Sequence, residues 1–377
     1  MIITTVRLHR LSIPLVAPFT TSFGTELTRE ALIVEVGAET AHGPVTGWGE
    51  CVAMDEPLYS AEYVDGCAEV IRRWLVPALT SSLPAGVELT AETVGHHVRH
   101  VVGHPMAKAA VEMAVLDAQL RAAGQSFAQY LGGVRDTVPS GVSVGIQDSV
   151  EQTLRVVDGY LTEGYVRIKL KIAPGWDVEP VRAVRSTFGD DVPLQVDANA
   201  AYTLVDTPTL RRLDEFDLLL IEQPLAENDL RQHAELASRL RTPICLDESV
   251  VSAESAADAI SLGAAQVINI KPGRVGGYLE AVRIHDLAKA HGVAVWCGGM
   301  VETGRGRSAN AALASLPGFV LPGDISASSR FYELDITEPV EMVSGRVAVD
   351  TTPGVGRAPV ADLLARFRMA EHEVFAR

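Results

Sequence analysis

Short runs of apolar residues recur from the middle of the chain onward, and each run ends in a polar residue. A stretch long enough for a helix separates one run from the next. Runs that are apolar throughout are typical of strands buried on both faces of a parallel sheet. Eight such runs are present, at Val142–Ile146, Val166–Ile172, Leu194–Asn199, Leu218–Pro224, Ile244–Ser249, Val267–Pro272, Val293–Gly299 and Leu321–Ser326. Eight strand-and-helix units over roughly 190 residues predict a TIM-type (β/α) barrel.

The chain before these runs has a mixed pattern. Residues Ile2–Ile13 and Ala31–Val36 read as strands, and the polar and aromatic segment Ala17–Gly24 between them is expected to be a loop. Helix formers and an apolar period of 3.6 residues predict a helix over Met106–Leu116. An α+β region therefore precedes the barrel.

These patterns divide the chain into two domains. We expect the α+β domain over residues 1–130 and the barrel over residues 131–340. The tail from about residue 340 carries a strand-like piece, Arg346–Asp350, and a turn rich in Pro and Gly. We expect this tail to return to the first domain.

Composition narrows the class of protein. The chain has 377 residues, of which 47% are hydrophobic and 21% charged, so it can bury a sizeable core and is neither disordered nor a disulfide scaffold. Its net charge of −16 would repel nucleic acid and anionic membranes, so we expect neither as a partner. The four cysteines are scattered and the N-terminus has no signal-peptide core, which favours a cytoplasmic location. No run approaches membrane-spanning length.

The polar residues that end consecutive runs form a regular series. Asp197 is followed by Glu222 after 25 residues, by Asp247 after another 25, and by Lys271 after another 24. Each step is one strand-and-helix unit, so these residues occupy equivalent places at the C-terminal ends of adjacent strands, where barrels keep their chemistry. A single carboxylate there is most often a helix cap or a surface salt bridge, whereas three at equal steps would point into one pocket and repel one another. A divalent cation relieves that repulsion, and all-oxygen ligands favour Mg²⁺ or Mn²⁺.

Two lysines precede this series on the second run. Lys169 and Lys171 are two residues apart, so they face the same side of a strand. Taken alone, the pair could lie at a surface edge. Lysines that face a barrel interior are costly unless they are paired or used in chemistry. With three acids on the following strands, we expect both lysines in the same site.

Together these strand ends form an ordered set of motifs. The set is Lys-Leu-Lys at 169–171, Val-Asp-Ala-Asn at 196–199, Ile-Glu-Gln-Pro at 221–224, Leu-Asp-Glu-Ser at 246–249 and Asn-Ile-Lys-Pro at 269–272. It resembles the enolase superfamily, in its muconate-lactonizing-enzyme branch, over nearly the whole chain. Further segments, at 21–24, 47–51, 164–168, 271–277, 296–300 and 322–326, resemble the N-acylamino acid (N-succinylamino acid) racemases that also act as o-succinylbenzoate synthases.

The resemblance implies an enolase-like barrel with an N-terminal capping domain, a homo-oligomer, a small-molecule carboxylate substrate and a bound Mg²⁺ or Mn²⁺. The implied metal ligands are Asp197, Glu222 and Asp247, and the implied acid/base lysines are Lys171 and Lys271, with Lys169 in support. The implied chemistry removes a proton α to a carboxylate while the metal stabilises the enolate as a Lewis acid. Lysines on opposite faces would take the proton from one side and return one to the other, which is racemisation.

A lysine can act as a base near neutral pH only when its pKa falls, and a neighbouring cation lowers it. We therefore expect Lys169 to lower the pKa of Lys171. Arg274 follows Lys271 by three residues. The resemblance implies that an arginine at this place marks racemase-active members, and we expect Arg274 to lower the pKa of Lys271.

The substrate pocket is expected to combine barrel loops with two segments of the capping domain, the loop Phe19–Gly24 and the stretch Met54–Tyr59. Its candidate residues are Phe19, Ser22, Phe23, Met54, Ser143, Asn199, Arg274, Met300, Asp324 and Ile325. The aromatic and methionine side chains among them would form an apolar wall, or would instead pack the interface between the domains. Arg305 and Arg307 follow the seventh run, and we expect them to be surface charges, although they could reach substrate.

The sequence leaves several functions open. The leading interpretation is a racemase with synthase activity. The alternatives are a dedicated o-succinylbenzoate synthase of menaquinone biosynthesis, a muconate cycloisomerase-like enzyme, and a barrel that binds ligands without catalysis. The intact set of carboxylates and lysines argues against the last, because a binding protein has no need of both opposed lysines.

Overall fold

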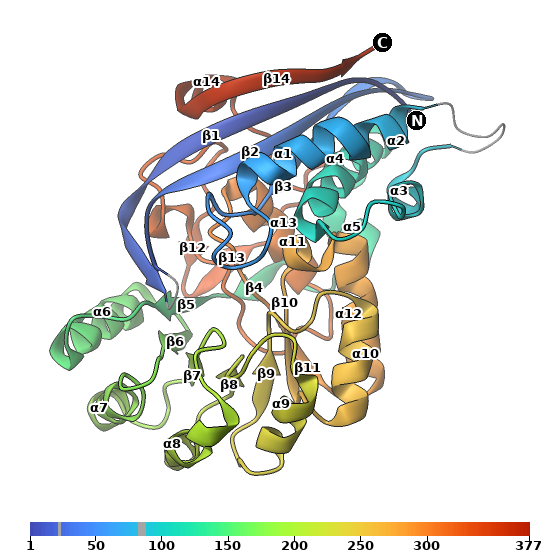
Figure 1. Ribbon diagram of the computed structural model, residues 1–377. Helices are drawn as coiled ribbons and strands as arrows, with labels where there is room; N and C mark the ends of the chain where they lie inside the picture. Colours follow the sequence, from blue (N-terminus) through green and yellow to red (C-terminus); the bar gives the residue numbers. More distant parts are fainter. Residues whose placement is uncertain (22–23, 82–87) are drawn as a thin grey trace.

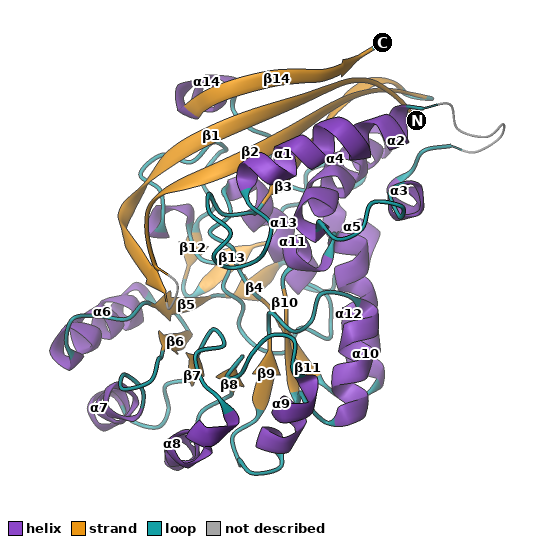
Figure 2. Ribbon diagram, viewed as in Figure 1, coloured by secondary structure: helices purple, strands orange, loops and turns teal. Residues whose placement is uncertain are grey.

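A curled parallel sheet ringed by helices forms one part of the molecule, and an antiparallel sheet with its own helices covers one end of it (Figure 1). The computed structural model describes residues 1–21, 24–81 and 88–377. Colouring by secondary structure separates the ring of helices from the strands inside it (Figure 2). The prediction of a (β/α) barrel with an N-terminal α+β capping domain is confirmed.

The antiparallel sheet joins the two ends of the chain. Its strands lie in the order β14-β1-β2-β3. Their bounds are β1 Ile2–Thr21, β2 Gly24–Thr40, β3 Gly43–Cys51 and β14 Arg368–Ala376. Strand β14 runs antiparallel to β1, so the last strand of the chain lies beside the first (Figure 1).

The loop expected over Ala17–Gly24 is wrong for the described part of that segment. Strand β1 separates from β2 after Pro14 and pairs with it again over Phe19–Thr21. Pro18 has no backbone N–H to donate, so the ladder is interrupted around it and resumes beyond it. The described part of the segment therefore continues the pairing of β1 with β2 instead of forming an irregular loop.

Helix α4 (Pro105–Ala123) packs on this sheet and includes the helix predicted from the sequence. It approaches β3 closely because β3 has glycines at two alternate positions. A Cβ atom at Gly47 would lie 2.1 Å from the carbonyl oxygen of Ala114, and one at Gly49 would lie 2.0 Å from that of Ala110. Shorter helices complete the domain: α1 Val64–Val70, α2 Val76–Thr80, α3 Ala91–His97 and α5 Phe127–Leu131.

The parallel sheet has the strand order β11-β10-β9-β8-β7-β6-β5. Its strands are β5 Gly141–Val144, β6 Arg167–Lys171, β7 Leu194–Asp197, β8 Ile221–Glu222, β9 Ile244–Leu246, β10 Val267–Ile270 and β11 Ala294–Cys297. The connecting helices are α6 Val150–Glu163, α7 Val178–Phe188, α8 Thr207–Arg211, α9 Leu230–Ala237, α10 Ala253–Leu262, α11 Pro272–Val275, α12 Tyr278–Ala290 and α13 Gly304–Ala314. Strands β6 to β10 are buried along their whole length, as their apolar runs predict.

The eighth predicted strand, Leu321–Ser326, does not form. This segment closes the ring between β11 and β5 through single hydrogen bonds, one of them from the N–H of Gly141 to the carbonyl oxygen of Gly323 at 2.8 Å. The N–H of Asp324 donates to the end of β11 at 2.9 Å. Because Pro322 cannot donate, a continuous ladder is not available to this segment.

After the barrel the chain runs back to the capping domain. Strands β4 (Thr137–Pro139), β12 (Met342–Val343) and β13 (Arg346–Ala348) form a small separate sheet. Helix α14 (Ala361–Phe367) then leads into β14. No helix in the described ranges is both long and apolar enough to cross a membrane, and the four cysteines are free and buried.

A buried carboxylate attaches the capping sheet to the barrel. Glu50 of β3 accepts hydrogen bonds from the N–H of Thr303 (2.9 Å), its Oγ1 (2.7 Å) and the N–H of Gly306 (2.9 Å). These donors belong to the first turn of α13, whose N–H groups have no partner within the helix. A negative charge is also favourable at this end of a helix.

Two arginines of α13 are buried, so the expectation of surface charges was wrong. Arg305 forms an ion pair with Asp117 of α4 at 3.0 Å, and both side chains are fully buried. A charge held so far from water needs such a partner. Arg307 turns instead into the wall of the pocket described below.

We expect Glu50→Ala to lower the free energy of unfolding by roughly 2–4 kcal/mol, because two backbone N–H groups and a hydroxyl lose their buried acceptor. Urea unfolding followed by circular dichroism measures this loss. Glu227 is exposed, so Glu227→Ala is the control and should change stability by less than about 0.5 kcal/mol. A loss below about 1 kcal/mol for Glu50→Ala would contradict the role of this contact.

Candidate active site

The register of the parallel strands brings the charged strand ends to one mouth of the barrel. Lys171 on β6 is the register partner of Asp197 on β7, which in turn is the partner of Glu222 on β8. Asp247 follows β9 and Lys271 follows β10. All five side chains are buried. The series read from sequence spacing therefore converges at the C-terminal mouth of the barrel.

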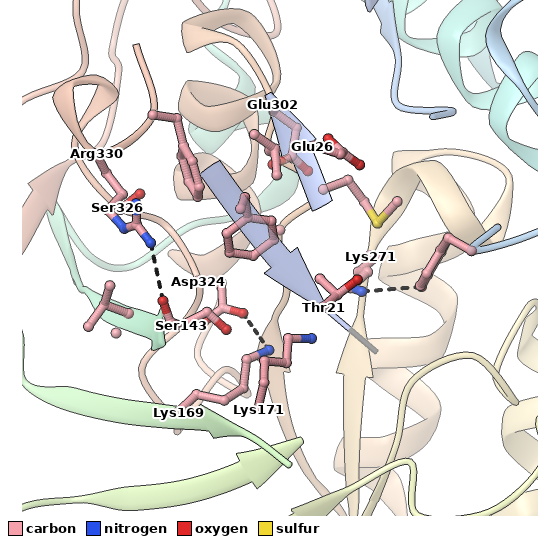
Figure 3. Close-up of a pocket in the computed structure, with 18 of the residues that line it drawn as sticks. Thr21, Glu26, Ser143, Lys169, Lys171, Lys271, Glu302, Asp324, Ser326 and Arg330 are labelled. Atoms are coloured by element: carbon pink, nitrogen blue, oxygen red, sulfur yellow. Dashed lines mark hydrogen bonds and ion pairs between the residues drawn. The ribbon is translucent and has the colours of Figure 1, made fainter. Parts of the chain in front are cut away.

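Lys171 and Lys271 approach this mouth from opposite sides. Strands β6 and β10 are separated by β7, β8 and β9. In a ring of eight positions, strands four steps apart face each other. Both lysines line one pocket, and Lys169 lies beside Lys171 (Figure 3).

The carboxylates at the mouth are paired with cations. The ion pairs are Lys171–Asp197 (2.7 Å), Lys169–Glu222 (3.1 Å), Lys169–Asp197 (3.3 Å), Lys169–Asp324 (2.7 Å), Arg167–Asp324 (2.8 Å) and Lys271–Asp247 (2.6 Å). Burying one of these charges without its partner would be strongly unfavourable. Each member of the cluster therefore depends on the others.

Burial and neighbouring charges set the protonation of the carboxylates. Burial, together with the nearby Asp197 carboxylate, raises the pKa of Glu222 above its usual range. Burial also acts on Asp197, but Lys171 and Lys169 outweigh it, so the pKa of Asp197 lies below its usual range.

Two of the lysines at the mouth, Lys169 and Lys271, are held in their charged form. Burial disfavours the ammonium group of Lys169, but Asp324 and the other carboxylates outweigh it and raise its pKa. Burial acts in the same way on Lys271, where Tyr59, Glu248 and the more distant acids raise the pKa. In this arrangement neither lysine is a neutral base.

Two amide side chains position the carboxylates. The Oε1 atom of Gln223 accepts hydrogen bonds from the N–H groups of Asp247 (3.0 Å) and Ser249 (3.2 Å), which fixes the turn after β9. Asn269 donates from Nδ2 to Oε1 of Glu222 at 2.7 Å. These groups fix the direction of the carboxylates independently of the lysines.

Most of the substrate-binding candidates from the sequence line the pocket. Those that do are Phe19, Met54, Ser143, Asn199, Met300 and Asp324. Ile325 is buried, and its carbonyl oxygen accepts a hydrogen bond from Ser140 at 2.7 Å instead of facing the pocket. Ser22 and Phe23 lie outside the described residues.

The sequence did not single out several residues that line the pocket. They are Glu26, Tyr59, Glu302, Ser326, Arg330 and Phe331. Arg307, which the sequence left able to reach substrate, also lines the pocket. The signal for Tyr59 was its place at the end of the 54–59 stretch expected near the mouth. Its hydroxyl donates to Asp247 (3.2 Å) and accepts from Lys271 (3.2 Å), so it lies between an acid and a lysine of the cluster.

Arg274 lies behind Asp247 and is not among the described residues that line the pocket. Its guanidinium forms an ion pair with Asp247 and donates from Nε to the carbonyl oxygen of Val250 at 3.0 Å. Asp247 is thus held between Arg274 and Lys271. The pKa of Lys271 lies above its usual value, which differs from the lowered pKa expected from Arg274.

The residue types at the mouth fit a divalent cation. In the part of the chain that the structure describes, no three Asp, Glu, His or Cys side chains are grouped so that they could hold an ion as they lie. Lysines and Arg274 instead contact the carboxylate oxygens. Two further buried acceptors, Oε2 of Glu248 and Oδ1 of Asn269, have no hydrogen-bond partner among the described residues. An all-oxygen donor set of this kind suits Mg²⁺ or Mn²⁺.

Comparisons with known proteins cover nearly the whole chain. Residues 3–132 match the family "Mandelate racemase / muconate lactonizing enzyme, N-terminal domain", and residues 152–362 match "Enolase C-terminal domain-like". The chain is 64% identical over 359 residues to an N-succinylamino acid racemase of Amycolatopsis, with 95% of each chain covered. It is 48% identical over 353 residues to an o-succinylbenzoate synthase of Geobacillus kaustophilus, with 93% of this chain and 92% of the relative covered.

The fold of the chain also matches that of a solved enolase superfamily member. A solved structure of an enolase superfamily member from Listeria innocua superposes with a TM-score of 0.94 at 38% identity, and all of both chains is covered. Both domains of the chain are matched by family models, and the strand-end carboxylates and lysines meet at one mouth of the barrel. This protein belongs to the enolase superfamily, in its mandelate racemase and muconate lactonizing enzyme group.

Proposed function

We propose that this protein racemises N-succinylamino acids by removing and returning the proton α to the carboxylate. The observation that carries the proposal is the placement of Lys171 and Lys271 on opposite sides of one pocket. The 64% identical racemase of Amycolatopsis supports the substrate class.

Membership of the enolase superfamily implies a divalent metal and a small carboxylate substrate. We assign the metal as Mg²⁺ or Mn²⁺ and its ligands as Asp197, Glu222 and Asp247. When bound, such a cation supplies a Lewis acid that stabilises negative charge on the substrate carboxylate. Lys171 and Lys271 would then face the substrate without their present carboxylate partners.

The two lysines act from opposite faces of the α-carbon. Lys171 accepts the proton at Nζ from one enantiomer, and Lys271 donates a proton from Nζ to the other face. The roles exchange for the opposite enantiomer. Asn199 accepts from Lys171 at 2.6 Å, and Tyr59 contacts Lys271 at 3.2 Å, so each Nζ has a fixed neighbour that keeps it aimed at the pocket. Lys169 stays charged and stabilises the enolate.

Dehydration to o-succinylbenzoate is a second candidate, favoured by the 48% identical synthase. That reaction needs one base, Lys171 in this assignment, while Lys271 serves as a fixed cation. Assays with an N-succinylamino acid, the synthase substrate and muconate separate racemase, synthase and cycloisomerase activity.

Removal of divalent metal should abolish exchange of the α-proton of an N-succinylamino acid in deuterated water, measured by proton NMR. Mg²⁺ or Mn²⁺ should restore it. Asp247→Asn should lower kcat/KM by roughly 1,000-fold because a ligand charge is lost. The exposed Asp362→Asn change is the control. Full exchange after dialysis against excess chelator would show that the metal assignment is wrong.

Lys171→Ala should stop α-proton exchange for one enantiomer, and Lys271→Ala should stop it for the other, because each lysine serves one face. The same NMR experiment, run on separated enantiomers, measures both. The exposed Lys289→Ala variant should behave as wild type. Racemisation at a near wild-type rate by either variant would refute the assignment of two bases.

A further inference from the structure

The pocket contains two arginines that the proposed chemistry does not use. Arg307 of α13 and Arg330 both line it. Within the described residues, neither is paired with a carboxylate. Among the described residues, Arg307 donates only to oxygens of Ser326, Ala327 and the backbone of Glu302. A guanidinium keeps its charge even when buried, so this end of the pocket carries two guanidinium charges that no described carboxylate pairs with, because the neighbouring Asp324 is already paired with Lys169 and Arg167.

Two aromatic rings and a backbone carbonyl hold Arg330 in place, and not all of its N–H donors are used. Its guanidinium carbon lies 5.1 Å from the ring centre of Tyr160 and 4.7 Å from that of Phe331. Nη2 donates to the carbonyl oxygen of Ser143 at 3.3 Å (Figure 3), while Nε has no partner among the described residues. Stacking between two rings fixes the plane of the guanidinium and leaves its edge able to bind a planar anion.

The position of Arg330 suits the far end of an extended substrate. Ser143 on β5 is the register partner of Lys169 on β6, so Arg330 lies one strand beyond Lys169. Figure 3 places Arg330 and Lys271 at opposite sides of the pocket. A substrate with its α-carbon between Lys171 and Lys271 can therefore extend a substituent along β5 toward Arg330.

We propose that Arg330 binds the terminal carboxylate of the N-succinyl group and so selects dicarboxylic acyl groups over neutral ones. This inference rests on the proposed racemase function and names a residue that sets its specificity. Arg307 adds to the positive potential at this end. Glu26 and Glu302 line a different part of the pocket (Figure 3), where they would repel the same carboxylate.

The test compares two derivatives of one amino acid, N-succinyl- and N-butyryl-phenylalanine. The butyryl group has a methyl where the succinyl group has its carboxylate. For Arg330→Met we expect KM for the succinyl substrate to rise roughly 10- to 100-fold, because a charge-assisted hydrogen bond is lost. We expect kcat on both substrates and KM for the butyryl substrate to stay within about threefold, because the lysines are untouched. Arg330→Lys should recover part of the preference for the succinyl over the butyryl substrate that Arg330→Met loses.

Arg182 provides a matched control, since it also stacks on a ring, 5.2 Å from that of Phe216, but lies outside the pocket. Arg182→Met should leave the preference for the succinyl substrate unchanged.

Equal losses on both substrates, or an unchanged preference in Arg330→Met, would overturn the proposal. If Arg330→Met unfolds, Arg330→Lys is measured instead, and an unchanged preference for the succinyl over the butyryl substrate in that variant would overturn the proposal. If the wild type binds both compounds without racemising either, the proposed function fails, and the ratio of their Kd values in wild type and variant still decides the role of Arg330.

Discussion

Charge neutralisation at the mouth of the barrel is the constraint on which the rest of the site depends. Five carboxylates and five cations meet there with little or no access to water: Asp197, Glu222, Asp247, Glu248 and Asp324 against Arg167, Lys169, Lys171, Lys271 and Arg274. Neither set could be buried alone at a tolerable cost. A divalent cation added to this balanced set makes the mouth net positive, which suits an anionic substrate in a chain of net charge −16.

The capping domain contributes apolar walls, Tyr59 and Glu26 to the pocket, whereas the barrel contributes all of the lysines and the carboxylates paired with them. Phe19 and Met54 reach the pocket from capping segments, and the lysines come from barrel strands. The contact between Glu50 and the start of α13 fixes the two parts relative to each other. A substitution in these apolar walls would therefore alter the shape of the pocket without touching the acid/base groups.

The sequence allows the charged series to be predicted because one repeat determines it. Asp197, Glu222 and Asp247 recur at the step of a strand-and-helix unit. The register of parallel strands then brings the ends of adjacent strands to the same mouth of the barrel. Arg330 carries no such signal, since it is the last residue of a short 3-10 turn, Ser328–Arg330, whose direction depends on tertiary contacts. The two errors in secondary structure have one cause: Pro18 and Pro322 interrupt ladders at points where apolar patterning cannot say whether pairing resumes.

Strand β14 lies against β1, although almost the whole chain separates them. A ribosome releases β1 first and the nine residues of β14 long afterwards. During that interval the outer edge of β1 presents unpaired backbone groups, which can pair with strands of other chains. In the finished sheet β14 covers that edge and, being mostly exposed and rich in charge, is itself a poor template for further strands. A strand that is made late thus covers the edge of one that is made early, and so removes a site for aggregation.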